Sequence, residues 1–151
     1  MSPQLVMILV VGAIIVIQAM VWIPLVTSWN QKSAAFFADL EKEMAASGEK
    51  TLIALEKGNY EGATDIYGPV AGAGKVMLTD RRLVFRKLTG GVVEIPTTKI
   101  KASRENSAFN GVGRIGAAMF IIETTDPVEV GFRLGDSKAW KKALDGVIAS
   151  A

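Results

Sequence analysis

The sequence contains no cysteine and no histidine among its 151 residues. Without cysteine the chain forms no disulfide, and it has no thiolate to serve as a nucleophile or as a metal ligand. Without histidine it lacks the usual general base and the commonest metal ligand in proteins. Ser-His-Asp catalysis, Cys-His catalysis and the usual zinc sites are therefore excluded. We expect a protein that is not an enzyme, with no catalytic residues, cofactor, metal site or small-molecule substrate.

The chain also lacks a strong charge of either sign. Its 17 basic and 15 acidic side chains give a formal net charge of +2. A dedicated nucleic-acid binder is usually much more basic. We therefore expect no nucleic-acid partner.

What the sequence does contain is a long apolar run near its start. Residues 5–26 carry no charge, and Gln18 is the one strongly polar side chain among them. As a helix the run would be roughly 33 Å long, enough for a hydrocarbon core of about 30 Å. It is longer than the apolar part of a signal peptide, and no Lys or Arg precedes it. The run predicts a permanent transmembrane helix over residues 5–27, after a short tail at 1–4.

The flanks of this run suggest its orientation. Trp22 and Trp29 lie where an aromatic belt would meet one membrane surface. Basic residues follow the run, first Lys32 and Lys42, and none precedes it. The positive-inside rule then places the N-terminus outside and the remaining chain in the cytoplasm. We expect a single-pass protein of a plasma membrane or a bacterial inner membrane.

Small residues in the run suggest a contact with a neighbouring helix. Gly12 and Ala19 are seven residues apart and share one helical face. Gln18 is placed to hydrogen-bond across such a contact. No GxxxG motif is present, so the sequence gives no sign of self-association. The three residues are candidates for packing the span against other subunits, besides the lipid bilayer itself.

A second, amphipathic helix is expected over residues 28–48 as a connector. Phe36, Phe37, Leu40 and Met44 recur at helical spacing opposite acidic and basic side chains. The stripe would contact the bilayer surface or a partner subunit, chiefly through Phe36 and Phe37, or it would pack on the domain that follows. A third interpretation is a rigid continuation of the membrane helix.

From residue 49 to 151 the pattern changes to short alternating runs separated by turns, which predicts a mainly β domain. Thr79–Arg82 and Thr125–Pro127 read as tight turns of two hairpins. Asp136 or Ser137 would cap a final helix. The expected fold is α+β, with six or seven antiparallel strands and one C-terminal helix. The predicted strands are 51–55, 75–78, 83–86, 91–95, 118–124 and 128–134.

Part of this domain resembles a known family. Residues 74–85 read GKVMLTDRRLVF, and Val93-Glu-Ile-Pro96 and Ile100 follow. This order resembles the GRAM branch of the pleckstrin-homology-like (PH-like) fold, over residues 48–150. The resemblance implies a strongly bent, partly open β-barrel that is capped by the last helix, with Trp140 plugging the barrel. It implies binding of lipid, peptide or protein and no catalysis.

A glycine motif matches a nucleotide-binding pattern only in its letters. Gly111-x-Gly113-x-x-Gly116 has the spacing of the dinucleotide fingerprint. That motif needs a strand before it and a helix after it. Here it follows a polar loop and precedes a β-branched strand, so we interpret it as a glycine-rich loop that binds no cofactor.

Basic residues gather within 24 positions of the domain. If they share one rim, they would bind anionic lipid, each charge contributing about 1 kcal/mol. The other interpretation is a set of solvated charges paired with local carboxylates. The set comprises Arg81, Arg82, Arg86, Lys87, Lys99, Lys101 and Arg104.

Residues 103–117 are expected to form a long polar loop that carries three apolar side chains. These are Phe109, Val112 and Ile115. Apolar residues that a loop does not bury often dock onto a partner. Insertion into the core is the alternative.

Together these features predict a non-enzymatic accessory or scaffolding subunit of a larger membrane protein complex, such as a respiratory or photosynthetic assembly. The alternative is a membrane-proximal module that binds or tethers anionic lipid through the basic set.

Overall fold

The computed structural model describes residues 3–113 and 118–150. The chain forms two compact units, Met1–Glu43 and Met44–Ala151. We describe each unit by itself.

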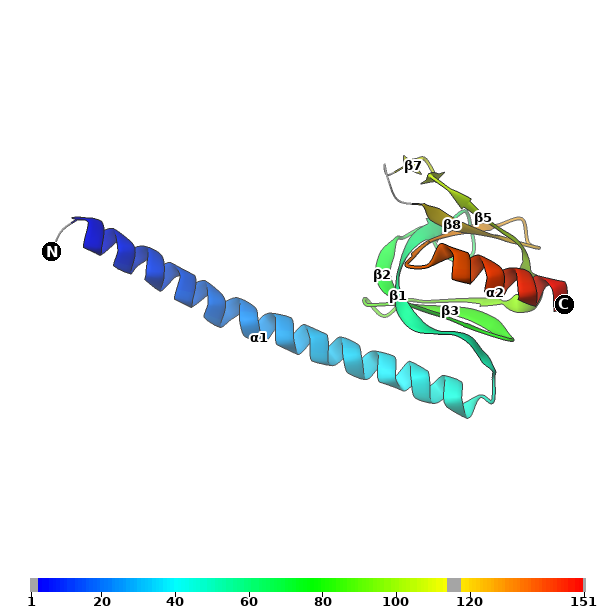
Figure 1. Ribbon diagram of the computed structural model, residues 1–151, viewed down its shortest axis with the longest axis horizontal. Coiled ribbons are helices and arrows are strands. Elements are labelled where there is room, and N and C mark those ends of the chain that lie inside the picture. The colour runs from blue at the N-terminus through cyan, green and yellow to red at the C-terminus, as the bar shows by residue number, and fades with distance from the viewer. Residues whose placement is uncertain (1–2, 114–117, 151) are drawn as a thin grey trace. The chain divides into compact units, whose positions relative to one another are not determined.

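One helix, α1, runs from Pro3 to Ala46 (Figure 1). The sequence predicts a span and a separate connector helix, whereas α1 passes through residue 24 and residues 28–30 without a break. Ser28 and Asn30 are residue types that can cap the start of a separate connector helix, but both lie inside α1. The stretch Val6–Ile23 is long and apolar enough to cross a bilayer, by length and composition, and none of its described residues is buried. After Ala46 the chain leaves the helix at Gly48, whose φ of 68° is a conformation that glycine adopts readily.

The C-terminal unit is built on an open, antiparallel sheet of seven strands in the order β4-β3-β2-β1-β9-β8-β5. The expected number of strands and the mainly β class are confirmed. Within the described residues the two edge strands, β4 and β5, do not pair, so the sheet is not a closed barrel. The strands are β1 (Thr51–Ala63), β2 (Gly72–Thr79), β3 (Arg82–Lys87), β4 (Val92–Pro96), β5 (Ile100–Asn106), β8 (Met119–Thr124) and β9 (Glu129–Leu134).

Three further elements complete the unit. The 3-10 turn η1 (Thr97–Lys99) joins β4 to β5, and β6 (Ala108–Phe109) and β7 (Val112–Gly113) pair as a small ribbon. Helix α2 (Ser137–Ser150) follows the sheet. Both predicted hairpins are present, at β2–β3 and at β8–β9.

Strand β1 belongs to both halves of the sheet. It pairs with β2 from Thr51 to Tyr60, but with β9 only from Gly58 to Ala63. Two register shifts interrupt its early pairing with β2. Such irregularities bend a strand and increase its twist. The long strand therefore curves from one half of the sheet into the other, as Figure 1 shows.

Aromatic rings fill the interior between these halves. The ring centroid of Tyr60 lies 5.8 Å from that of Phe85 and 5.6 Å from that of Phe132. Trp140 and Leu144 of α2 are fully buried in the same cluster. The Asp136 carboxylate accepts a hydrogen bond from the Ala139 amide at 3.1 Å, which confirms the predicted cap of α2. Trp140 is buried in the core, but the sheet that it packs against is open and is not a closed barrel.

The expected long loop at 103–117 is wrong in its first part. Residues up to Asn106 continue β5, which pairs with β8. Phe109 is 5 % exposed and packs with Met119 and Ile121 in a separate small cluster. Of the two interpretations of Phe109, insertion into a packed cluster is the one observed. The side chain of Val112 and all of Ile115 lie outside the described residues.

We predict that Gly131→Ala destabilises the domain through Phe109. A Cβ at Gly131 would lie 2.5 Å from Cδ1 of the Phe109 ring, so the ring must leave its place. Overpacking of this kind typically costs about 1–3 kcal/mol in the free energy of unfolding. Urea denaturation of the full chain in mild detergent would measure it, using Trp140 fluorescence in a Trp22→Phe, Trp29→Phe background.

Gly135→Ala is the matched control, because a Cβ there meets no atom within 4 Å. It should leave the stability unchanged. Equal losses in both variants would contradict the packing argument.

Candidate functional site

The predicted site residues of α1 lie on described backbone, and several have described side chains. Gly12 and Gln18 are exposed, and Trp22 is 64 % exposed. A Cβ added at Gly12 would meet no atom within 4 Å. Phe37 is 4 % exposed. The side chains of Ala19, Trp29 and Phe36 lie outside the described part of the structure.

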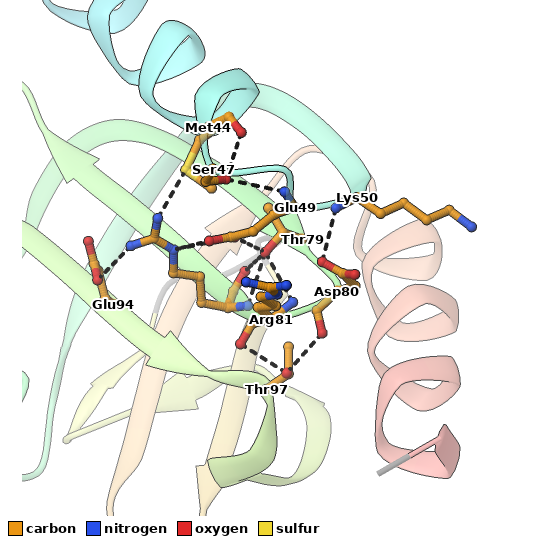
Figure 2. A network of polar contacts seen from close by, with 10 residues as sticks. Met44, Ser47, Glu49, Lys50, Thr79, Asp80, Arg81, Glu94 and Thr97 are labelled. Carbon is orange, nitrogen blue, oxygen red and sulfur yellow. Dashed lines mark hydrogen bonds and ion pairs between the residues drawn. The ribbon is translucent and has the colours of Figure 1, made fainter.

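A buried carboxylate that the sequence pattern did not reveal lies at the start of the C-terminal unit. Glu49 has 7 % of its side chain exposed and pairs with Arg82, whose Nε is 3.2 Å from Oε1. Thr79 donates its hydroxyl hydrogen to Glu49 at 2.7 Å. Arg82 also donates to Glu94 at 3.1 Å, and its other nitrogen lies 3.6 Å from the Met44 sulfur (Figure 2). The network holds residues 44–49 against β2, β3 and β4.

The turn between β2 and β3 completes this network. The Lys50 amide donates to Asp80 Oδ1 at 3.0 Å, and the Asp80 amide donates to the Lys50 carbonyl at 2.9 Å. The Thr79 hydroxyl oxygen accepts from the Arg81 and Arg82 amides at 3.2 and 3.0 Å. Thr97 donates its hydroxyl to the carbonyls of this turn, as Figure 2 shows.

These contacts give residues 79–82, which read TDRR, a structural role. Thr79 and Asp80 form the turn and bind the incoming chain, while Arg82 neutralises Glu49. Gly74, the first residue of the motif, also has a packing reason, because a Cβ there would lie 2.8 Å from the Phe85 ring and would overlap the Arg86 carbonyl. Glu49 and Asp80 both accept hydrogen bonds within this network. It acts as a joint.

The carboxylates around Arg82 keep it protonated. Burial lowers its pKa, but hydrogen bonds from Arg82 to Glu49 and Glu94 and the charges of both carboxylates outweigh that effect, so the pKa is raised overall. Arg82 therefore stays cationic beside Glu49.

Several members of the predicted basic set are ion-paired with carboxylates. Lys99 pairs with Asp126 at 2.7 Å, and Arg104 pairs with Glu123 at 3.0 Å and Glu129 at 2.7 Å. These hydrogen bonds raise the pKa of both basic groups. Together with Arg82, at least three of the seven are ion-paired within the described part of the chain, as the alternative interpretation expected.

The other members of the basic set lie on different elements. Lys87 of β3 donates to the Val70 carbonyl at 2.6 Å, and its ammonium lies 4.6 Å from the centre of the Tyr60 ring. Arg86 is half-buried on the same strand. Arg81 in the β2–β3 turn and Lys101 on β5 are exposed. The side chains of these last two reach no ion-pair partner among the described residues.

Tyr60 is a buried phenol at the opposite end of β1 from Glu49. Its oxygen lies 2.9 Å from the Tyr67 carbonyl and 2.5 Å from the Gly68 carbonyl, to which it donates. Burial raises the pKa of Tyr60 to about 12. The hydroxyl therefore closes the β1–β2 loop in its neutral form.

Comparison with solved structures shows one that shares the fold. The crystal structure of the C-terminal domain of an unknown protein from Leishmania infantum is 13 % identical, with a TM-score of 0.53 over 75 % of this chain and 98 % of that one. Linker-DH/PH domains of p115-RhoGEF match with a TM-score of 0.47, and Vav1 with 0.48, both at 13 % identity. The match covers 69 % of this chain and 30 % of the p115-RhoGEF chain, and 80 % of this chain and 33 % of the Vav1 chain.

No family model matches the chain, so the GRAM resemblance gains no support from that comparison. No curated protein matches it either.

We predict that Arg82→Met destabilises the domain by about 3 kcal/mol, because it leaves the Glu49 carboxylate buried without its cation. Urea denaturation monitored by Trp140 would measure the change. Adding Glu49→Gln should restore much of the loss, since the buried charge is then absent. Arg81→Met, next to it but exposed, is the control and should have almost no effect.

If Arg82→Met and Arg81→Met had the same free energy of unfolding, the ion pair of Glu49 and Arg82 would not stabilise the domain.

Alkaline pH should destabilise the domain through Tyr60. Its folded pKa of about 12 lies above the unfolded value of 10.0, so its contribution is fully present below pH 10 and is lost as pH rises toward 12. The loss attributable to Tyr60 should reach about 2–3 kcal/mol near pH 12. Tyr60→Phe has no such ionisation, and the difference between the two unfolding curves across this range isolates the effect. Parallel curves would contradict it.

Proposed function

We propose that this protein is a non-enzymatic accessory or scaffolding subunit of a larger integral membrane complex. Helix α1 would be its anchor, and the C-terminal unit would dock on a partner surface. The observation that carries the proposal is the exposed apolar stretch Val6–Ile23 of α1, none of which is buried within the described residues.

This stretch favours a membrane because water would be a poor solvent for it. Its exposed side chains include Met7, Ile8, Ile15 and Ile17, each at least 60 % exposed. Burial of apolar area is worth roughly 25 cal/mol per Å², so a stretch of this size requires either lipid or protein around it. An α-helix also satisfies its own backbone hydrogen bonds, as the bilayer interior demands.

Two features of α1 favour neighbours beyond lipid. Gly12 leaves an open notch on the surface of the helix. Gln18 is exposed six residues later, and an amide in lipid is stabilised when another helix accepts or donates a hydrogen bond. Helices of a polytopic partner would fill the notch at Gly12 and would hydrogen-bond to the Gln18 amide.

The C-terminal unit would be a PH-like domain, of GRAM type if the resemblance holds. The GKVMLTDRRLVF segment, the helix-capped sheet and the central Trp140 support this assignment. We place this domain in the cytoplasm and the N-terminus outside, because the lysines follow the apolar run. A fold of this kind serves binding, and function must come from the surfaces that it presents.

Lipid binding by the basic set is the competing hypothesis. Ion pairing of Arg82, Lys99 and Arg104 weakens it, since a paired cation attracts anionic lipid less than a free one. Charge reversal at the exposed Arg81 and Lys101 tests what remains. Loss of liposome binding in these variants, with salt dependence, would favour the lipid hypothesis.

The first experiment is purification of the full chain from its own membranes in mild detergent, followed by size determination and mass spectrometry. Stoichiometric recovery with a large membrane complex would support the proposal. Recovery of a bare small protein would overturn it.

We predict that Gly12→Leu lowers this recovery while the protein stays in the membrane fraction. Leucine preserves the apolar character of the span, but it fills the notch where a neighbouring helix would approach. Ile14→Leu is the matched control, because residue 14 lies about 200° around the helix from residue 12. Equal recovery of both variants would show that the notch is not a contact.

A further inference from the structure

A groove in the C-terminal unit lies between β1 and α2. Its volume is about 550 Å³. Leu52 and Ile53 form one wall, and Ala139, Ala143, Gly146 and Val147 form the other. All of these residues belong to one compact unit. No motif in the sequence points to this surface.

The groove follows from the way β1 is paired. Residues 51–57 of β1 pair with β2, and β9 joins on the other side only from Gly58 onward. Helix α2 lies beside residues 51–57, which have β2 but not β9 as a neighbouring strand. Small side chains on α2 keep the space open, and a Cβ at Gly146 would meet no atom within 4 Å. Leu52 is 38 % exposed on the opposite wall.

Two lysines line the groove, and neither ammonium has a partner among the described residues. They are Lys50 and Lys142. The Lys50 side chain extends away from the Glu49 network, as Figure 2 shows. Asp80, the one carboxylate of the groove, already accepts the Lys50 backbone amide. The groove thus combines apolar walls with two lysines against one carboxylate, a net positive charge, whereas Arg82, Lys99 and Arg104 elsewhere are ion-paired.

We propose that this groove binds an amphipathic helix of the partner subunit, with large apolar side chains along one face and acidic residues beside them. The inference rests on the proposed function. Leucine-sized anchors at i, i+3, i+4 and i+7 suit a groove walled by small residues. Alanine and glycine on α2 allow the two helices to approach within about 8–10 Å. Acidic residues would pair with Lys50 and Lys142 and set the register.

A helix fits better than an added strand. Strand addition needs a regular row of free amide and carbonyl groups. The part of β1 that has β2 as a neighbour but not β9 contains two register shifts in its pairing with β2, between Thr51 and Ile53 and between Ile53 and Glu56. Irregularities of this kind prevent extended pairing at a sheet edge. Side-chain contacts with α2 and Leu52 therefore carry the recognition.

If both proteins are anchored in one membrane, even a low affinity of the groove for the partner helix would be sufficient for binding. Two sites on the same pair of molecules bind with an effective concentration set by their tether, which reaches the millimolar range for short tethers. The experiment must therefore use the full chain in its own membranes.

The test places a photo-crosslinking amino acid at Leu52 and, in a separate variant, at the control position Ala149, which is exposed on α2 and does not line the groove. Crosslinked peptides are then identified by mass spectrometry. The expected result is attachment at Leu52 to one segment of one membrane-complex subunit, with the apolar spacing of a helix and acidic flanks. Attachment to a strand-like segment, to lipid alone, or equally from both positions would overturn the inference.

Groove variants sharpen the result. Gly146→Leu fills the groove and Lys142→Glu reverses its charge, and each should lower the crosslink from Leu52 by roughly tenfold. Ala149→Leu and Lys138→Glu are the matched controls on the same helix and should leave it unchanged. Trp140 fluorescence confirms that each variant is folded. A crosslink unaffected by both groove variants would overturn the inference.

The outcome also separates this inference from the proposed function. If the chain still purifies with its complex but the groove variants and the Leu52 probe show no helix, only the groove assignment fails. If the wild-type chain purifies with no complex, both fail.

Discussion

The C-terminal unit depends on one strand that serves two halves of a sheet. β1 is 13 residues long, and its partners change from β2 alone to β2 and β9 near Gly58. A flat strand of that length would keep one set of side chains on one face throughout. Because the register shifts bend β1, Tyr60 points into the interior that Phe85 and Phe132 share. Helix α2 then has an open end to cover, and Trp140 fills it.

The same strand connects the core to the polar network around Glu49. Trp140 donates its indole hydrogen to Glu56 on β1 at 2.6 Å, so the buried ring has its polar atom satisfied. Seven residues earlier along the chain, Glu49 is satisfied by Thr79 and Arg82. Both carboxylates precede Gly58, the point at which β9 becomes a neighbour of β1. Before Gly58, where β9 does not pair with β1, the side chains of Glu49 and Glu56 therefore connect this part of the chain to the rest of the domain.

Much of this fold could be predicted from the sequence. Turn residues marked the β2–β3 and β8–β9 hairpins, and Asp136 marked the start of α2, because these signals act within a few residues. The continuous course of α1 was less evident, since Ser28 and Asn30 suit a helix cap as well as a helix interior. Strand β5 was missed because its residues, which include Ser103, Arg104 and Glu105, lack alternation. Their conformation comes from pairing with β8, which local sequence does not reveal.

Site residues were harder to predict than the fold, for a related reason. A cluster of basic residues in sequence says nothing about which carboxylates lie opposite them in space. Arg104 finds Glu123 and Glu129 only because β8 and β9 follow β5 in the sheet. Phe109 looked exposed in a polar segment, yet Gly131 leaves room for its ring.

Unpaired charge is therefore more informative about binding than the number of charges. The sequence draws attention to residues 81–104, which include seven cations, but at least three of these form ion pairs with described carboxylates. Lys50 and Lys142 are far apart in sequence and line one apolar groove. A neutralised cation contributes to the stability of the domain, whereas an unpaired one beside exposed apolar surface offers a partner both charge and burial. By this criterion the groove between β1 and α2 is a stronger candidate for recognition than the basic set.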